Sequence, residues 1–179
     1  AARIEGYDLV SPVPATNWGR IAIRDGAGVT VAGNTITNAG GPDPWFGGEV
    51  VGVFVGAGAT NVLVEDNIFG PLVAGDAELP VVGVRVEANA RDTVTLRGNR
   101  FHDLCGDCDR PGRNNPVAGV ESARSLLAHH NLFARLHGEE SMAYRLSEGV
   151  SVALISLETH ADCTARGRAA AVLVALGSS

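Results

Sequence analysis

Acidic residues recur at matching places in segments of the chain that lack a regular hydrophobic pattern. Each lies nine residues after one of four evenly spaced asparagines, or flanks a cysteine at that place: Asp43, Asp76, Asp107 and Asp109 on either side of Cys108, and Glu140. A column of carboxylates could bind Ca²⁺, which prefers several oxygen ligands, or could raise the pKa of one carboxyl group for acid–base chemistry. The alternative is that irregular loops scatter these acids as ordinary surface charge.

The same segments contain further candidate ligand-binding residues. Trp45 stands among glycines and prolines, and could stack its ring on a sugar or fold down over a strand edge. Arg110 and Arg113 follow the acids in HDLCGDCDRPGRNNP. Together with the acids, these residues are candidates for a polysaccharide-binding surface.

Two of the three cysteines, Cys105 and Cys108, form a CxxC pair. A zinc site would need two more ligands at suitable spacing, and only His102 is near, so we expect no metal at this pair. A disulfide suits an exported protein, and free thiols are the alternative. His129 and His130 would point to opposite faces of a strand, so they are interpreted as surface residues.

The elements that must position these residues come from an internal repeat. Its landmarks are Asn34, Asn67, Asn99 and Asn131, at steps of 33, 32 and 32 residues. An apolar residue follows two positions after each asparagine (Ile36, Phe69, Phe101, Phe133), and another precedes each by three positions (Val31, Val64, Leu96, Ala128). This alternation predicts a strand with one buried face.

A second apolar strand precedes each of these. It starts at Gly19, Glu49, Pro80 and Pro116, with GVSV at Gly149 as a weaker copy. A longer loop closes each unit, the last of them reading ARLHGEESMAYRLSEG. Extending the repeat backwards puts Ala2 at the position of Asn34, and extending it forwards puts Cys163 there. The apolar segment AAAVLVAL near the C-terminus is expected to form a terminal strand.

The Asn-x-Ile and Asn-x-Phe copies and the V-x-G-V strands resemble the right-handed parallel β-helix repeat family, the pectate-lyase-like solenoids, over roughly residues 19 to 136. The resemblance implies an all-β, right-handed parallel β-helix of about five coils with 32–33 residues per coil. We expect a single domain, 1–179, with coils at 1–18 (partial), 19–48, 49–79, 80–115, 116–148 and 149–179 (degenerate or capping). The asparagines are expected to form a structural ladder, each adopting the left-handed backbone conformation and hydrogen-bonding to the next.

This fold hosts many functions, so the resemblance implies little chemistry by itself. Its sugar-cleaving members carry W-x-D-H and R-x-P-x-x-R segments, or N-T-D, D-D and G-H-G segments, and this chain has none of them. We therefore expect an exported, non-catalytic module, secreted or at the cell surface, that is structural, adhesive or carbohydrate-contacting. The alternative is a polysaccharide lyase, hydrolase or epimerase that acts in a groove beside the loops.

Composition excludes several other classes. The formal charge of −6 argues against a nucleic-acid partner. All fourteen basic residues are arginine, so lysine chemistry is excluded. The sequence contains no run of about eighteen apolar residues, so no membrane-spanning helix is expected. A solenoid of only a few coils has open strand edges at its ends. We therefore expect self-association or a longer parent chain there.

Overall fold

The computed structural model describes residues 2–11, 21–38, 49–73, 80–88, 92–106, 115–147, 150, 152–156 and 163–174. The regular elements in these ranges are all β-strands. They are β1 (Ala2–Glu5), β2 (Asp8–Ser11), β3 (Ile21–Ala27), β4 (Val29–Ala32), β5 (Thr35–Asn38), β6 (Val50–Thr60), β7 (Leu63–Glu65), β8 (Ile68–Phe69), β9 (Leu72–Val73), β10 (Val81–Val86), β11 (Val94–Arg97), β12 (Arg100–Cys105), β13 (Val117–Ser122), β14 (Leu126–His129), β15 (Leu132–Leu146), β16 (Val152–Ser156) and β17 (Cys163–Val174).

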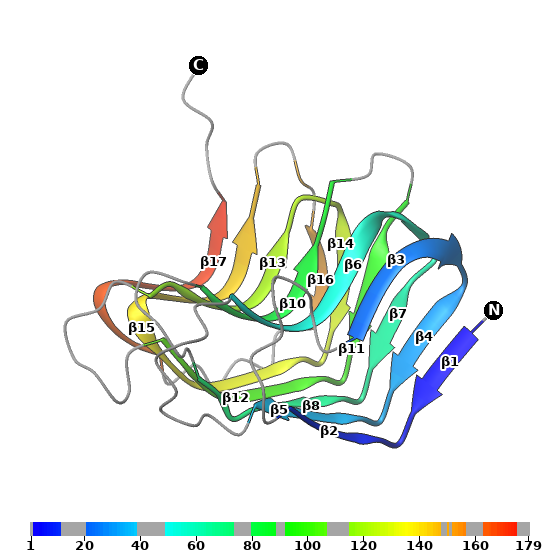
Figure 1. Ribbon diagram of the computed structural model, residues 1–179. Helices are drawn as coiled ribbons and strands as arrows, with labels where there is room; N and C mark the ends of the chain where they lie inside the picture. The colour runs from blue at the N-terminus through cyan, green and yellow to red at the C-terminus, as the bar shows by residue number, and fades with distance from the viewer. Residues whose placement is uncertain are drawn as a thin grey trace.

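The strands pair in parallel and cycle among three sheets about five times (Figure 1). The first sheet is β1-β4-β7-β11-β14-β16. The second contains β2, β5, β8 with β9, β12 and β15, and the third contains β3, β6, β10, β13 and β15. The long strands β15 and β17 run through both the second and the third sheet. The chain is therefore a right-handed parallel β-helix, as predicted.

The predicted repeat sets the register of the central coils. In the first sheet, Val31 pairs with Val64, Val64 with Leu96, and Leu96 with Ala128. All four of these side chains are buried. Buried and more exposed residues alternate along β11 and β14, whereas Ala32 in β4 and Glu65 in β7 are buried as well. The expected alternation is confirmed in β11 and β14, and in all four strands the predicted inward residue faces the core.

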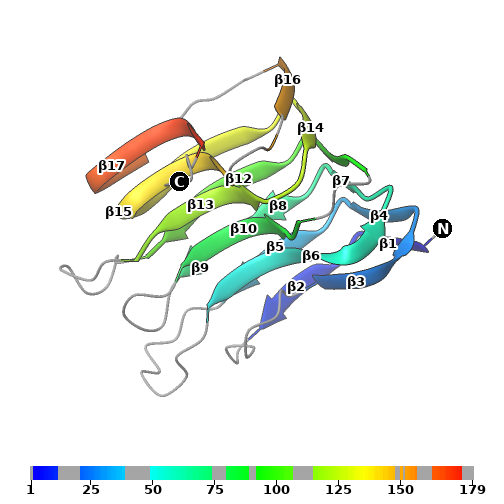
Figure 2. The ribbon, with the colours of Figure 1, turned by 90° about the horizontal axis from the view of Figure 1, so that it is seen from above.

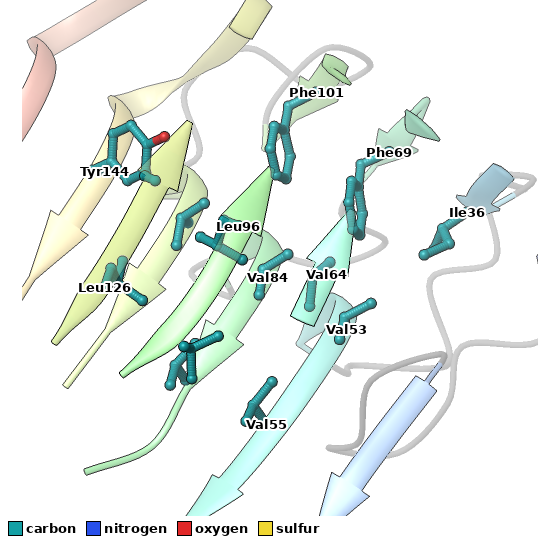
Figure 3. Close-up of a cluster of buried hydrophobic side chains, with 14 of the residues drawn as sticks. Ile36, Val53, Val55, Val64, Phe69, Val84, Leu96, Phe101, Leu126 and Tyr144 are labelled. Atoms are coloured by element: carbon teal, nitrogen blue, oxygen red, sulfur yellow. The ribbon is translucent and has the colours of Figure 1, made fainter. Parts of the chain in front are cut away.

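Aromatic rings form a stack in the core, and Figure 3 shows two of them, Phe69 and Phe101, side by side. The rings of Phe69 and Phe101 stack with centroids 4.6 Å apart, and those of Phe101 and Phe133 are 4.7 Å apart. Tyr144 ends the row with an edge contact to Phe133 at 5.0 Å. Because each ring repeats the position of the last, one stacking interaction is formed for each added coil.

A row of glycines in the third sheet makes room for this stack. A Cβ atom at Gly83 would lie 2.5 Å from Cδ1 of Phe101, and one at Gly52 would lie 2.8 Å from Cδ1 of Phe69. Gly119 would meet Phe133 in the same way. The glycine of each V-x-G-V strand is therefore required because a phenylalanine of the second sheet packs against its backbone.

The asparagine ladder runs through the corner between the first and second sheets. The Oδ1 atom of Asn99 accepts hydrogen bonds from the backbone N–H and from Nδ2 of Asn67, both at 3.1 Å. Nδ2 of Asn99 donates to the carbonyl of Val64 (2.9 Å) and to Oδ1 of Asn131 (2.9 Å). The same contacts join Asn34 to Asn67. These buried amides therefore satisfy both side-chain and backbone groups from coil to coil.

The expected backbone conformation of the ladder residues is wrong. The residue before each asparagine, not the asparagine itself, takes the left-handed conformation: Gly33 (φ 60°), Asp66 (52°), Gly98 (64°) and His130 (49°). That residue turns the chain, and the asparagine then points inward to form the ladder. One residue makes the corner and the next one joins the coils.

The two ends depart from the extrapolated repeat. Ala2 pairs with Val29, so the ladder position of the first coil belongs to Tyr7, whose N–H donates to Oδ1 of Asn34 at 3.0 Å. Cys163 pairs with Leu136 and therefore lies beyond the ladder position. Extending the repeat by a constant number of residues gives the wrong position at both ends. The coils there differ in length and carry no asparagine to mark the corner.

The last predicted loop is also wrong. The segment ARLHGEESMAYRL lies within the continuous strand β15, because this coil passes from the second sheet to the third without an inserted loop. The third-sheet strand of this coil is its second half, where Ser141 pairs with Val117 and Leu146 with Ser122. GVSV was expected to be a copy of that strand; its last residue, Val152, begins β16, which pairs with β14 in the first sheet.

Candidate functional site

Most of the predicted site residues lie outside the described residues. They are Asp43, Trp45, Asp76, Asp107, Cys108, Asp109, Arg110 and Arg113. Glu140 is described, and it lies inside strand β15 with its Cα paired with that of Arg168. The carboxylate column and the groove beside Trp45 therefore stay predictions.

Cys105 is disulfide-bonded and buried at the end of β12. It pairs with His137 of β15, and Cys163 lies on the far side of that strand, where it pairs with Leu136. Two strand spacings put Cys105 and Cys163 about 10 Å apart, beyond the reach of a direct disulfide. The pairing of Cys105 with Cys108 stays the prediction for the partner.

The described residues bring together one cluster that sequence reasoning did not assemble: His102 and Asp103 of β12, and Arg135 of β15. Nε of Arg135 donates to Oδ1 of Asp103 at 2.5 Å, and Nη2 donates to Oδ2 at 2.6 Å. Nδ1 of His102 lies 2.8 Å from the same Oδ2 atom. We call these three residues the His–Asp–Arg cluster. It lies on the outer surface of the second sheet, partly exposed to solvent.

Local backbone geometry turns the acid and the arginine outward. Asp103 (φ 53°) and Arg135 (φ 52°) are both left-handed and stand one above the other in adjacent coils. This conformation is unfavourable for residues other than glycine and persists where the surroundings enforce it. Here the paired kinks in β12 and β15 place a carboxylate directly opposite a guanidinium.

The charge state of the cluster follows from its contacts. The hydrogen bonds from Arg135 hold the pKa of the Asp103 carboxyl well below its usual range, and the contact with His102 adds to this effect. An ionised carboxylate can only accept hydrogen bonds, so the Nδ1 atom of His102 must be the donor. Nε2 is then the atom of the ring that can take up or release a proton.

The cluster could therefore transfer a proton, but it offers little else. Asp103 has both oxygens engaged by Arg135 and cannot act as an acid while it is ionised. Two-carboxylate glycoside hydrolysis needs one carboxyl group to protonate the leaving group and a second to act on the sugar or on water. The cluster holds one carboxylate only. Its chemistry is that of a single histidine oriented by an acid.

Ion pairs that join coils are a general feature of this surface. On the first sheet, Glu65 pairs with Arg97 and lies 3.6 Å from Nη1 of Arg3. On the third sheet, Arg85 pairs with Glu49, and with Glu121 at 3.2 Å. The Asp103–Arg135 pair is the second-sheet counterpart. Only the added histidine separates the His–Asp–Arg cluster from these inter-coil contacts.

A fully buried arginine, Arg124, forms hydrogen bonds between coils at another corner of the solenoid. Nη1 of Arg124 donates to the carbonyl of Ala59 at 2.7 Å and lies 3.2 Å from Oδ1 of Asp92. Nη2 donates to the carbonyl of Gly56 at 3.0 Å. Ser122 lies beside it, with its hydroxyl bonded to the Arg124 backbone. The guanidinium thus connects one coil to the two coils before it, and its role is structural.

Sequence reasoning considered His102 only as a zinc ligand and did not use Asp103 or Arg135. A signal for the pair was present. Asp103 and Arg135 each come four residues after a ladder asparagine, and they carry opposite charges. Residues at equal distances from the ladder lie in adjacent coils, so this pattern predicts an inter-coil ion pair. The contact of His102 with Asp103 depends on the backbone kink and had no such signal.

Two general features of a site are not found in the part of the chain that the structure describes. No group of three or more histidine, cysteine, aspartate or glutamate side chains there could hold a metal ion. Within the same residues, no helix is long and apolar enough to cross a membrane.

Comparisons with protein-family models, with curated proteins and with solved structures found no match to this chain.

Proposed function

We propose that this chain is an exported, non-catalytic β-helix module that serves as a rigid structural or adhesive element and contacts carbohydrate through its loops. The observation that carries the proposal is the asparagine ladder. The buried amides of Asn34, Asn67, Asn99 and Asn131 bond to one another and to backbone groups of adjacent coils. Polar groups used in this way hold coils together and are not available to a ligand.

The disulfide at Cys105 supports export, because disulfides persist in oxidising compartments. It lies at the end of β12, shortly before Arg110 and Arg113 in the sequence. The predicted disulfide to Cys108 would hold the residues that follow β12 close to the frame. Loops on a rigid frame commonly carry binding residues.

The test is a screen of the whole chain against neutral and anionic polysaccharides, with turnover and binding measured separately. We expect binding without turnover, and we expect Trp45→Ala to weaken the binding. An exposed tyrosine on the frame, Tyr7, provides a matched control, because Tyr7→Ala removes an aromatic ring without altering the loops. Turnover that disappears in Asp76→Asn and Asp109→Asn would overturn the proposal.

A polysaccharide lyase, hydrolase or epimerase is the second candidate, and the His–Asp–Arg cluster is the observation that favours it. A carboxylate-oriented histidine is a common general base. If the cluster is catalytic, His102→Asn abolishes turnover, and Asp103→Asn shifts its pH profile. The matched control is His130→Asn, which changes an exposed histidine at a ladder corner. Turnover that persists in His102→Asn would exclude this role for the cluster.

A further inference from the structure

The solenoid presents two strand edges that have no described neighbour. We call β1, β2 and β3 the N-terminal edge, and β16 and β17 the C-terminal edge. Each of these strands pairs on one side only among the described strands. Figure 2 shows the two edges on opposite sides of the molecule. Within the part of the chain that the structure describes, both edges therefore present a row of backbone donors and acceptors that a parallel strand could use.

The columns of the core reach both edges with the same kind of residue. In the first sheet, one column runs from Ala2 through Val29 and Leu126, and another from Ile4 through Val31 and Ala128. The third sheet has two equivalent columns. Aliphatic residues occupy all four columns at both edges: Ala2, Ile4, Ile21 and Ile23 at one, and Val152, Leu154, Val172 and Val174 at the other.

Parts of both edges lack the charges that usually prevent pairing, whereas β2 carries Asp8, β3 carries Arg24 and Asp25, and the first half of β17 carries Arg166 and Arg168. Strand β16 reads VALIS, and the last six residues of β17 read AAAVLV, so neither stretch contains a charged residue or proline. On β1, Arg3 and Glu5 neutralise each other through two hydrogen bonds, at 2.6 and 2.9 Å. Natural proteins commonly place unpaired charges or proline on exposed edge strands to block association.

We propose that the N-terminal edge of one molecule binds the C-terminal edge of a second copy, head to tail, so that the β-helix continues across the contact. This inference rests on the proposed structural function. A second copy is the fitting partner because an occupant must meet edges of three sheets at once, in parallel and at the same corner spacing. The opposite edge of the same solenoid has that shape, whereas a single extended peptide can cover one sheet edge only.

Such a contact is heterologous and does not close, so it generates linear assemblies. Continuing the observed register would place Val172 of one copy beside Ile21 of the next, and Leu173 beside Ala22. Ala22 is exposed, and its column carries Arg85 and Glu121 in the central coils. By register, these two positions belong to a column that already carries charges in the central coils.

The experiment uses two double variants, Ala22→Asp with Leu173→Asp and Ala22→Lys with Leu173→Lys. Sedimentation velocity over about a hundredfold concentration range measures association, and circular dichroism checks the fold. The unmodified chain should form species that grow with concentration. Each double variant should need at least about tenfold more protein to associate, because like charges meet at the contact. A mixture of the two should associate again, since aspartate then faces lysine.

Ile68→Asp with Thr93→Asp is the matched control, because it adds two charges at exposed positions away from both edges and should associate like the unmodified chain. A chain that stays monomeric at every concentration would overturn the proposal. Association that is unchanged in the double variants, or not restored by mixing, would overturn it too. These outcomes are independent of carbohydrate binding, so failure of this inference is distinguishable from failure of the proposed function.

Discussion

Asn99 and Asp103 are four residues apart in sequence, and each bonds to the next coil, but they lie in different environments. Asn99 is fully buried and joins the ladder through its amide. Asp103 is on the outer surface, and its side chain retains 39% of its exposure. A buried polar group that loses its partner has no water to replace it, whereas an exposed one does. The interior contacts should therefore determine stability, and the outer ones should be free to serve a ligand.

The largest expected effect comes from filling the space between the glycine row and the aromatic stack. In Gly83→Val, the new side chain would collide with the ring of Phe101 and with the carbonyl of Gly119, 2.6 Å from the Cβ position. We expect a loss of more than about 4 kcal/mol or failure to fold. Urea unfolding followed by circular dichroism measures it. Ala88→Val, at an exposed site, is the control, and equal stability of the two variants would contradict the packing argument.

Breaking the ladder should have the next largest effect. Asn99→Ala leaves the backbone N–H of Asn67 and the carbonyl of Val64 without their side-chain partner. We expect a loss of about 3 kcal/mol, since each buried unsatisfied group costs about 1–3 kcal/mol. Thermal and urea unfolding provide the measurement. Thr95→Ala, an outward residue of the same coil, should change little. A stable Asn99→Ala variant that loses ligand binding would mean that the ladder has a functional role.

The hydrogen bond between Asn131 and Tyr144 ends the ladder, and its loss should cost less stability than the loss of Asn99. Tyr144→Phe removes the hydroxyl that accepts a hydrogen bond from Nδ2 of Asn131 at 3.2 Å, and Nδ2 keeps its bond to the carbonyl of Leu96. The expected loss is about 1 kcal/mol. Stacking with Phe133 is retained, so a loss as large as that of Asn99→Ala would show that the hydroxyl carries more of the ladder than one hydrogen bond.

The same residue gives a pH dependence. Burial raises the pKa of Tyr144 to about 12. The unfolded chain ionises this tyrosine near pH 10, so its contribution to stability is complete below that pH and is lost as pH rises from about 10 to about 12. Denaturant unfolding across this range should show a decline in the unmodified chain that is smaller in Tyr144→Phe. If the stability of both proteins declined equally, the pH dependence would not come from Tyr144.

The smallest expected effect is on the outer surface. Asp103→Asn removes the charge that pairs with Arg135, and asparagine tolerates the left-handed backbone. We expect less than about 1 kcal/mol at neutral pH. Because Arg135 depresses the pKa of Asp103, the pair contributes above the unfolded value near pH 3.9, and its contribution disappears as pH falls below that value. Urea unfolding at pH 7 and pH 3 measures the contribution of this pair. A loss of stability at pH 7 as large as that of Asn99→Ala would contradict the expected difference between the outer surface and the buried ladder.

The sequence predicts the central coils well because the ladder asparagines mark every corner. Phe69, Phe101 and Phe133 repeat with them, so register and inward facing follow from period and alternation alone. The ends could not be predicted in this way. Tyr7 replaces asparagine in the first coil, and no landmark follows Asn131, so a change in coil length leaves no trace in the pattern.

The candidate site was harder to predict than the fold because it depends on conformation. Of the acids that sequence reasoning selected, Glu140 lies inside β15 and the others lie outside the described residues. His102 and Asp103 meet through a kink in β12 that no residue type demands. What the repeat does encode is the placement of Arg135 opposite Asp103, since both follow a ladder asparagine at the same distance.

The buried guanidinium of Arg124 has a consequence for how the molecule unfolds. Solenoid stability is usually described as a sum over coils and their nearest neighbours, so that terminal coils can unfold first. Arg124 instead bonds to Gly56 and Ala59, two coils earlier, as well as to Asp92 in the coil between. Separating any one of these three coils would remove at least one partner of a buried charge. The centre of the array should therefore unfold in one cooperative step, with fraying confined to the coils outside it.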